Sequence, residues 1–446
     1  MFVCLGPGRR PPLSGMATMA KSALAAAALA LGASVLKPEW AIGHLSRFVE
    51  DDRPPANLPH GGSYAVPGSG IVANEGAPFL LVLSPGDPTK PLNGEFLANF
   101  LKENTDWFRD TFFKYGAVIF RGFEVLDAKS FELVVLAITK DLATVYLGTS
   151  PRNSINGTTY VHTAADFKPH RTLPTHLEMS FRDNPPRTQL FYAHQLDHQY
   201  GGETPLTNFE GVWQTLSEDE RIRKTYSAAK VKYIRNNDAC ESVNTFSLSS
   251  SLDPLMQKCW QDMFKTSDRQ KVFEKCKEEQ FQCTFFDDWN GRVRMTNVQP
   301  FVRQHPVSGN TVWFNHINVL TRNSMVYDYE RTAALWGGIQ GLWPMALGVW
   351  YRVLFGFLSM IWNENDFGSA VSFDDDSLIP EEDLRAFKRA VWKNTMQAPY
   401  QLHDIVLVDN MKVGHGREMY TGEKGSRMIM TAWSDNYPAQ WFAKGE

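Results

Sequence analysis

The sequence contains few cysteines and no long run of basic residues. Its five cysteines include no Cys-x-x-Cys pair, which argues against a zinc knuckle and against a dense disulfide framework. A reducing compartment suits this pattern, although the cysteines between Cys240 and Cys283 could still form one disulfide. The 45 basic and 49 acidic residues give a net charge of −4, and no Lys/Arg run could follow a phosphate backbone. Nucleic acid is therefore not an expected partner.

The first 38 residues lack acidic side chains altogether. They carry four basic residues and an alanine-rich apolar stretch from Ser22 to Leu36, which predicts a targeting leader over residues 1–38. A mitochondrial or plastid destination is favoured, and the secretory pathway is the alternative. The stretch is short for a membrane span. A disordered tail, or initiation at Met16 or Met19, would also explain the segment.

The rest of the chain has no internal repeat and no low-complexity tract. Residues 39–76 are rich in proline and glycine and predict an irregular lead-in, followed by one compact domain over residues 77–446. Helical spacing of apolar residues predicts a helix over residues 95–115 that ends at Gly116, and a strand follows over residues 117–123.

Capping signals predict two further helices, one opening at the Ser217-x-x-Glu220 box and one just after Pro380. Short β-like runs separated by turn residues cover residues 188–194, 311–315, 405–408 and 427–433. We therefore expect a mainly β domain with surrounding α-helices, built on a jelly-roll core.

A long apolar segment interrupts the second half of the sequence. Residues 332–351 carry no charge, and aromatic residues recur every seven positions from Trp336 to Phe357, which predicts one helix from Pro344 to Trp362. A core or lid helix is the favoured interpretation. Membrane contact through residues 335–362 is the alternative, although Arg352 would be costly in the middle of a span.

The first candidate for chemistry is the pair His176 and Glu178. They are two residues apart, so in an extended segment their side chains project from the same face. An imidazole and a carboxylate on one face supply half of a metal site. Alone, such a pair is more often a surface pair or a satisfied core histidine.

Three later residues would complete that site. His415 follows a buried strand, and two histidines with one carboxylate are the ligand set of non-haem ferrous oxygenases, which leave coordination positions open. Arg427, twelve residues further on, offers a planar fork for a dicarboxylate co-substrate. Thr204 could add a hydroxyl to the same carboxylate.

The order and spacing of these residues resemble the taurine dioxygenase (TauD/TfdA-like) and clavaminate synthase-like oxygenases. The matching stretches run in family order from about residue 77 to residue 435 and comprise residues 115–123, 149–152, 174–181, 201–206 and 409–417. The resemblance implies a double-stranded β-helix in which His176, Glu178 and His415 bind Fe(II). It also implies that Thr204 and Arg427 bind 2-oxoglutarate.

The resemblance further implies the reaction. Such enzymes use O2 to convert 2-oxoglutarate into succinate and CO2 while they hydroxylate or desaturate a C–H bond of a second substrate. That substrate would here be a small amine or amino-acid-like molecule or a secondary metabolite. The cofactor supplies the chemistry, and the protein supplies position and exclusion of water.

Three departures from the family pattern narrow this expectation. Glu178 stands where most relatives have aspartate, which is similar to the clavaminate synthase branch and disfavours halogenation because the carboxylate is kept. Thr431 stands where taurine-type members place a second arginine for the anion of the substrate, so a small sulfonate is not expected. Residues 316–368 form an apolar helical insertion where compact relatives have a shorter connection.

Weaker candidates and rival functions remain open at this stage. Arg152, Asn156, His162 and Thr163 precede the metal motif and are candidate substrate contacts, although Arg152 could merely brace its loop. A catalytically idle relative acting as a binding or membrane-docked interaction protein is one rival function. A zinc hydrolase is another, because two histidines and a carboxylate also suit zinc, but no His-Glu-x-x-His helix accompanies them.

Overall fold

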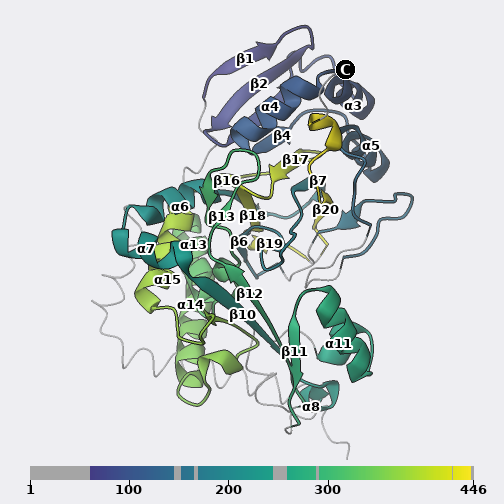
Figure 1. The fold of residues 1–446 in the computed structure, drawn as a ribbon. Coiled ribbons are helices and arrows are strands. Elements are labelled where there is room, and N and C mark those ends of the chain that lie inside the picture. The colour runs from purple at the N-terminus through teal and green to yellow at the C-terminus, as the bar shows by residue number, and fades with distance from the viewer. Residues whose placement is uncertain are drawn as a thin grey trace, which may run out of the picture.

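The computed structural model describes residues 61–144, 152–164, 169–244, 259–287, 291–423 and 425–442. The predicted leader, residues 1–38, and most of the predicted lead-in lie outside the described residues. Within them, mixed sheets and helices form two regions that meet around β6 and β18, as Figure 1 shows.

The largest sheet has eight strands in the order β1-β2-β3-β4-β17-β7-β20-β5. Neighbouring strands are antiparallel, except that β3 and β4 are parallel. The strands are β1 (Ser63–Val66), β2 (Ile71–Ala77), β3 (Leu80–Pro85), β4 (Ala117–Phe120), β5 (His162–Thr163), β7 (Thr188–Leu196), β17 (Ile405–Asp409) and β20 (Arg427–Ser434).

The sheet begins earlier in the chain than the sequence predicted. Residues 63–76, which we expected to be irregular, form β1 and most of β2. Pro67, Gly68 and Gly70, which contributed to that expectation, lie in the turn between these strands, where Gly68 and Gly70 have φ angles of 71° and 69°. Turn chemistry was recognised correctly, but the short strands on either side of the turn were not.

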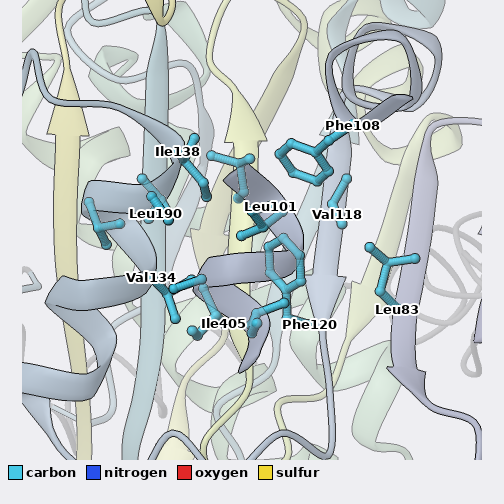
Figure 2. Packing of buried hydrophobic residues seen from close by; sticks show 14 of the residues in the cluster. Leu83, Leu101, Phe108, Val118, Phe120, Val134, Ile138, Leu190 and Ile405 are labelled. Atoms are coloured by element: carbon cyan, nitrogen blue, oxygen red, sulfur yellow. The ribbon is translucent and has the colours of Figure 1, made fainter. Parts of the chain in front are cut away.

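Helices α3 (Gly94–Glu103), α4 (Thr105–Tyr115) and α5 (Ala128–Ile138) pack on one face of this sheet. Figure 2 shows Leu101, Phe108 and Val134 of these helices against Val118 and Leu190 of the strands. The single helix predicted over residues 95–115 is thus two helices that meet at Asn104. Its predicted end at Gly116 is confirmed, because Gly116 has a left-handed φ of 90° at the C-cap.

A second sheet packs on the other face of the first. It has four strands in the order β16-β9-β18-β6, with bounds β16 (Thr395–Ala398), β9 (Thr204–Asn208), β18 (Val413–Arg417) and β6 (Leu173–His176). Buried residues of both sheets, among them Leu206, Val413, Phe191 and Val406, form one apolar cluster. The two sheets are therefore held face to face by a shared core, as expected when apolar side chains alternate along the strands.

A third sheet lies in the other region and has the order β11-β12-β10-β15. Its strands are β10 (Lys230–Asn237), β11 (Gln282–Phe285), β12 (Val293–Pro300) and β15 (Ser369–Phe373), and it shares a core with α6 (Phe209–Ser217), α7 (Glu220–Ala228), α11 (Arg269–Glu278) and α15 (Glu381–Lys393). The predicted capping box at Ser217 is wrong, because α6 ends there. Asp219 caps α7 by accepting hydrogen bonds from the backbone of Arg221 and Ile222. The helix after Pro380 begins as predicted.

Two disulfides join cysteines in this region, where the sequence suggested at most one. Cys240 of α8 (Cys240–Asn244) bonds Cys259, which precedes α10 (Trp260–Phe264), and Cys276 of α11 bonds Cys283 of β11. Both bridges lie beside the third sheet. The remaining short elements are β8 (Tyr200–Gly201), β13 (Arg303–Gln304), β14 (Thr311–Val312), β19 (Tyr420–Thr421), η1 (Glu364–Asp366) and η2 (Ala439–Trp441).

The apolar insertion forms three helices, α12 (Ile317–Leu320), α13 (Ser324–Trp336) and α14 (Gly338–Leu358). Helix α14 begins six residues before the predicted start at Pro344, because the left-handed φ angles of Gly337 and Gly338 break the chain there. One side of α14 packs on α13, and the other side leaves several large apolar residues exposed, including Ile339, Trp343 and Phe357. By length and composition, α14 alone among the described helices could cross a membrane.

A buried ion pair ties α13 to the second sheet. The guanidinium of Arg331 binds both carboxylate oxygens of Glu418, which follows β18, and Gln397 of β16 donates a further hydrogen bond to Glu418. The side chain of Glu418 is only 1% exposed and that of Arg331 15%. Loss of the guanidinium would leave a buried carboxylate without its cation.

We therefore expect Arg331→Met to lower the free energy of unfolding by about 3–5 kcal/mol, as is typical when a buried ion pair loses one partner. Arg352→Met on α14 is the matched control, because its ion pair with Glu330 is more exposed than that of Arg331 and should contribute at most about 1 kcal/mol. Thermal unfolding followed by circular dichroism would compare the two variants. Equal melting temperatures would show that the Arg331 ion pair does not secure the insertion.

Candidate active site

The two candidate histidines face each other across neighbouring strands. His176 of β6 and His415 of β18 are direct cross-strand partners, and their ring centroids lie 4.7 Å apart. The strands can approach because glycines flank His415. A Cβ on Gly414 would lie 2.2 Å from the ring of Phe209, and one on Gly416 would lie 2.5 Å from a backbone oxygen of β6. The histidine is thus on a strand of its own, whereas the sequence placed it at the exit turn of the preceding strand.

Glu178 is held in place by Asn410, which follows β17. The Asn410 side-chain oxygen accepts from the backbone N–H of Glu178 at 2.6 Å, and its nitrogen donates to the backbone oxygen of Glu178 at 3.0 Å. The next residue, Met179, has a left-handed φ of 51°, which is unusual for a side chain of this kind. Asn410 thus fixes the backbone of the candidate ligand.

The three side chains fit a metal ion. One ligand atom of each of His176, Glu178 and His415 lies within 4.8 Å of the others, and all three residues are buried. The Nδ1 atom of His176 lies 2.9 Å from the carbonyl oxygen of Pro174, so Nε2 remains for the metal. Two imidazoles and one carboxylate suit ferrous iron. The donor set and its burial therefore match the group that the sequence implied.

The electrostatics of the site keep His176 and Glu178 in their metal-binding forms. Burial, with a smaller contribution from the neighbouring histidines, lowers the pKa of His176 to about 3, so its imidazole is neutral at physiological pH. Burial opposes the charged form of Glu178, but a hydrogen bond with His415 and the charge of Arg152 hold the pKa of Glu178 well below its usual range. A neutral imidazole and an ionised carboxylate are what a metal ion requires.

Arg427 and Thr204 lie together, as a co-substrate anchor would require. The Nε atom of Arg427 donates to the carbonyl oxygen of Gly202 at 3.0 Å, and one Nη atom lies 3.3 Å from the hydroxyl of Thr204. Tyr400 lies beside them, with the guanidinium carbon 5.8 Å from the centre of its ring. Burial raises the pKa of Tyr400 to about 12, so the hydroxyl stays protonated. Sequence reasoning missed Tyr400, since it sits between β16 and β17 without a recognisable motif.

One cavity joins the candidate metal ligands to this anchor. Its lining includes His176, Glu178, His415, Thr204, Tyr400 and Arg427. Arg152 also lines it, with one Nη atom 3.4 Å from a carboxylate oxygen of Glu178, and buried Gln189 donates to the same oxygen at 3.3 Å. Arg152 therefore contacts the candidate metal ligand directly. The other residues of the matching stretch, Thr149 to Pro151, lie outside the described residues.

Three predicted substrate contacts, Asn156, His162 and Thr163, do not line this cavity. Asn156 is exposed. His162 is buried with its ring 4.9 Å from that of Trp433, and the hydroxyl of Thr163 accepts from the backbone of Asn153. Proximity in the sequence to the metal motif suggested these residues. His162 and Thr163 instead lie on the short strand β5, at the edge of the eight-stranded sheet.

The insertion and the third sheet supply cavity residues that the sequence did not indicate. His316 lines the cavity, with its ring 5.1 Å from that of His176 and its Nδ1 atom 3.1 Å from the hydroxyl of Ser180. Arg235 and Ser369 come from β10 and β15. These residues lie far from the metal motif in the sequence, and only the packing of the third sheet brings them close.

Comparison with known proteins places this sequence in a family. The model of the family described as "Taurine catabolism dioxygenase TauD, TfdA family" matches residues 84–433. The dapdiamide synthesis protein DdaC of Enterobacter agglomerans is 25% identical over 316 residues, which cover 71% of this chain and 82% of that protein. A clavaminate synthase-like protein of Arabidopsis thaliana is 24% identical over 357 residues, which cover 78% of this chain and 91% of that protein.

Among solved structures, PvcB of Pseudomonas aeruginosa is similar, with 12% identity and a TM-score of 0.43 over 84% of this chain and 95% of that one. It is described as an Fe, alpha-ketoglutarate dependent oxygenase from an isonitrile synthetic pathway. The family assignment rests on the sequence match, which includes all three candidate metal ligands and Arg427. Because this match spans most of the chain, the protein belongs to the taurine catabolism dioxygenase TauD, TfdA family.

Proposed function

We propose that this protein is an Fe(II)- and 2-oxoglutarate-dependent oxygenase. The observation that carries the proposal is the joint placement of His176, Glu178, His415 and Arg427 around one cavity. The reaction would convert 2-oxoglutarate and O2 into succinate and CO2 while a second substrate is hydroxylated or desaturated. That substrate would be a small amine or amino-acid-like molecule or a secondary metabolite. We also infer that the two sheets packed face to face form the double-stranded β-helix expected for this family.

Different residues of the cavity would bind the metal, bind 2-oxoglutarate and position the metal ligands. His176, Glu178 and His415 would bind Fe(II), which when bound supplies the site for O2 and for oxidation of the substrate. Arg427 would bind the far carboxylate of 2-oxoglutarate through its planar fork, with Thr204 as a second contact. Gln189 and Arg152 would hold the carboxylate of Glu178 toward the metal, as outer partners of metal ligands do. Retention of Glu178 supports hydroxylation or desaturation rather than halogenation.

The proposal is tested by loading the purified protein with Fe(II) under anaerobic conditions, adding 2-oxoglutarate and O2, and measuring succinate. We expect succinate release that depends on Fe(II), even without a second substrate. Protein loaded with Zn(II) should release none, because zinc has no redox chemistry. No succinate from the iron-loaded protein, in the absence or presence of a metabolite mixture, would favour the idle relative. Hydrolysis by the zinc-loaded protein without 2-oxoglutarate would favour the hydrolase.

A further inference from the structure

The charges that line the cavity are strongly unbalanced. Among the described residues of its lining, one is acidic, Glu178, and five are arginines: Arg152, Arg171, Arg235, Arg417 and Arg427. In the proposed complex, the charges of Fe(II) and Arg427 would balance those of Glu178 and the 2-oxoglutarate dianion. Four guanidiniums therefore remain to set the charge of the space left for the second substrate.

The strand that carries Arg427 does not supply a further cation to this space. Thr431, four residues later, is fully buried, and its hydroxyl donates to the carbonyl oxygen of Leu190 at 2.8 Å. It is also not part of the cavity lining. The positive charge beside the metal site must therefore come from other elements of the fold.

All four remaining arginines have contacts within the protein, and those of Arg152, Arg171 and Arg417 lie around the candidate metal ligands. Arg152 lies against Glu178, as described above. Arg417 donates to the backbone oxygen of Arg171 at 2.6 Å, and Arg171 in turn lies 3.6 Å from the sulfur of Met325. The contacts of Arg171 join the segment before β6 to β18 and α13.

Arg235 comes from a different sheet and has a hydroxyl beside it. It lies on β10 directly across from Ser369 of β15, so the two side chains emerge on the same face, and both line the cavity. The half-buried carboxylate of Glu279 interacts with both Arg235 and Arg182, so its one negative charge is shared between two guanidiniums.

His316 connects the metal site with the pair of Arg235 and Ser369. Its ring contacts that of His176, and it interacts electrostatically with Arg235. A guanidinium and a hydroxyl held by two paired strands form a rigid, bidentate site that matches a carboxylate. Resting on the proposed function, we infer that Arg235 and Ser369 bind a carboxylate group of the second substrate and thereby select acids over their neutral analogues.

Binding can be tested without turnover. Protein loaded with Mn(II) and saturating 2-oxoglutarate under anaerobic conditions would be screened by thermal shift against amino acids, hydroxy acids and aryl carboxylic acids, each beside its primary amide. Saturating 2-oxoglutarate keeps Arg427 occupied, so the probes report on a different site. We expect some acids, but not their amides, to raise the melting temperature. Stabilisation by the amides as well, or by no member of the panel, would overturn the inference.

The best acid would then be titrated by calorimetry against two variants. Arg235→Gln should weaken its binding at least about 30-fold, as is typical when one partner of a buried charge pair is removed. Lys232→Gln is the matched control, because Lys232 lies on the same strand, outside the cavity lining, with an ion pair to Asp376 at 2.8 Å. Equal affinities of the two variants would assign the acid to another site. Acid binding without any succinate release from iron-loaded protein would instead count against the proposed function alone.

Discussion

Replacement of His415 by alanine is expected to prevent iron retention and to lower succinate release by more than about 100-fold. The loss should exceed the 10- to 100-fold typical of residues that only support a metal ligand, because His415 would supply one of three protein ligands. His176 is its direct cross-strand partner, so the variant would keep only His176 and Glu178 as protein ligands on one side of the metal. Iron content by metal analysis and succinate by mass spectrometry would be measured on the same preparation.

His162→Gln is the matched control for this experiment. His162 is also a buried histidine in a strand, but it packs on Trp433 outside the cavity lining. We expect this variant to keep its iron and most of its activity. If His162→Gln lost iron as completely as His415→Ala, the effect would reflect general damage to the fold rather than loss of a ligand. The assignment of the metal site would also fail if His415→Ala kept full iron content.

Replacement of Arg427 by glutamine should raise the KM for 2-oxoglutarate about 30-fold to several thousand-fold. This range corresponds to the loss of about 2–5 kcal/mol when a buried charge pair loses one partner. Arg427 is well placed for this role, since its contacts with Gly202 and Thr204 orient the guanidinium within the cavity. Steady-state succinate release at increasing 2-oxoglutarate concentrations would give the KM.

Arg427→Lys separates charge from shape at the same position. Lysine keeps the positive charge but lacks the planar fork, so we expect a KM between those of the wild type and Arg427→Gln. Iron content should be unchanged in both variants, because Arg427 is not a metal ligand. A wild-type KM for 2-oxoglutarate in Arg427→Gln would mean that the co-substrate is anchored elsewhere in the cavity.

The parts of the site that could be predicted are those encoded by local spacing. The two-residue interval between His176 and Glu178 has a direct meaning in an extended segment, and the structure places both side chains at one point. Arg427 could be recognised because its distance from His415 in the sequence matches a family pattern. Local signals also predicted parts of the fold. The glycine at position 116, for example, indicated where a helix ends.

The parts that could not be predicted depend on contacts between distant segments. Asn410 holds the backbone of Glu178 although 232 residues separate them. Arg235 reaches the cavity only because a third sheet packs beside the metal site, and no periodicity in the sequence reports how sheets pack. Asn156, which sequence proximity to the metal motif suggested as a substrate contact, does not line the cavity. Residues that are close to a site residue in the sequence can lie outside the site, and residues that are distant in the sequence can lie within it.

The two disulfides bear on how this protein is handled in the laboratory. Ferrous iron is easily lost to oxidation, so a reductant is needed during purification, and a thiol reductant would also attack Cys240–Cys259 and Cys276–Cys283. The second bridge includes β11, whose partner β12 pairs in turn with the strand of Arg235. A thiol-treated sample could thus keep its iron and still handle its second substrate poorly. Comparing thiol and non-thiol reductants at equal iron content would prevent that defect from being mistaken for metal loss.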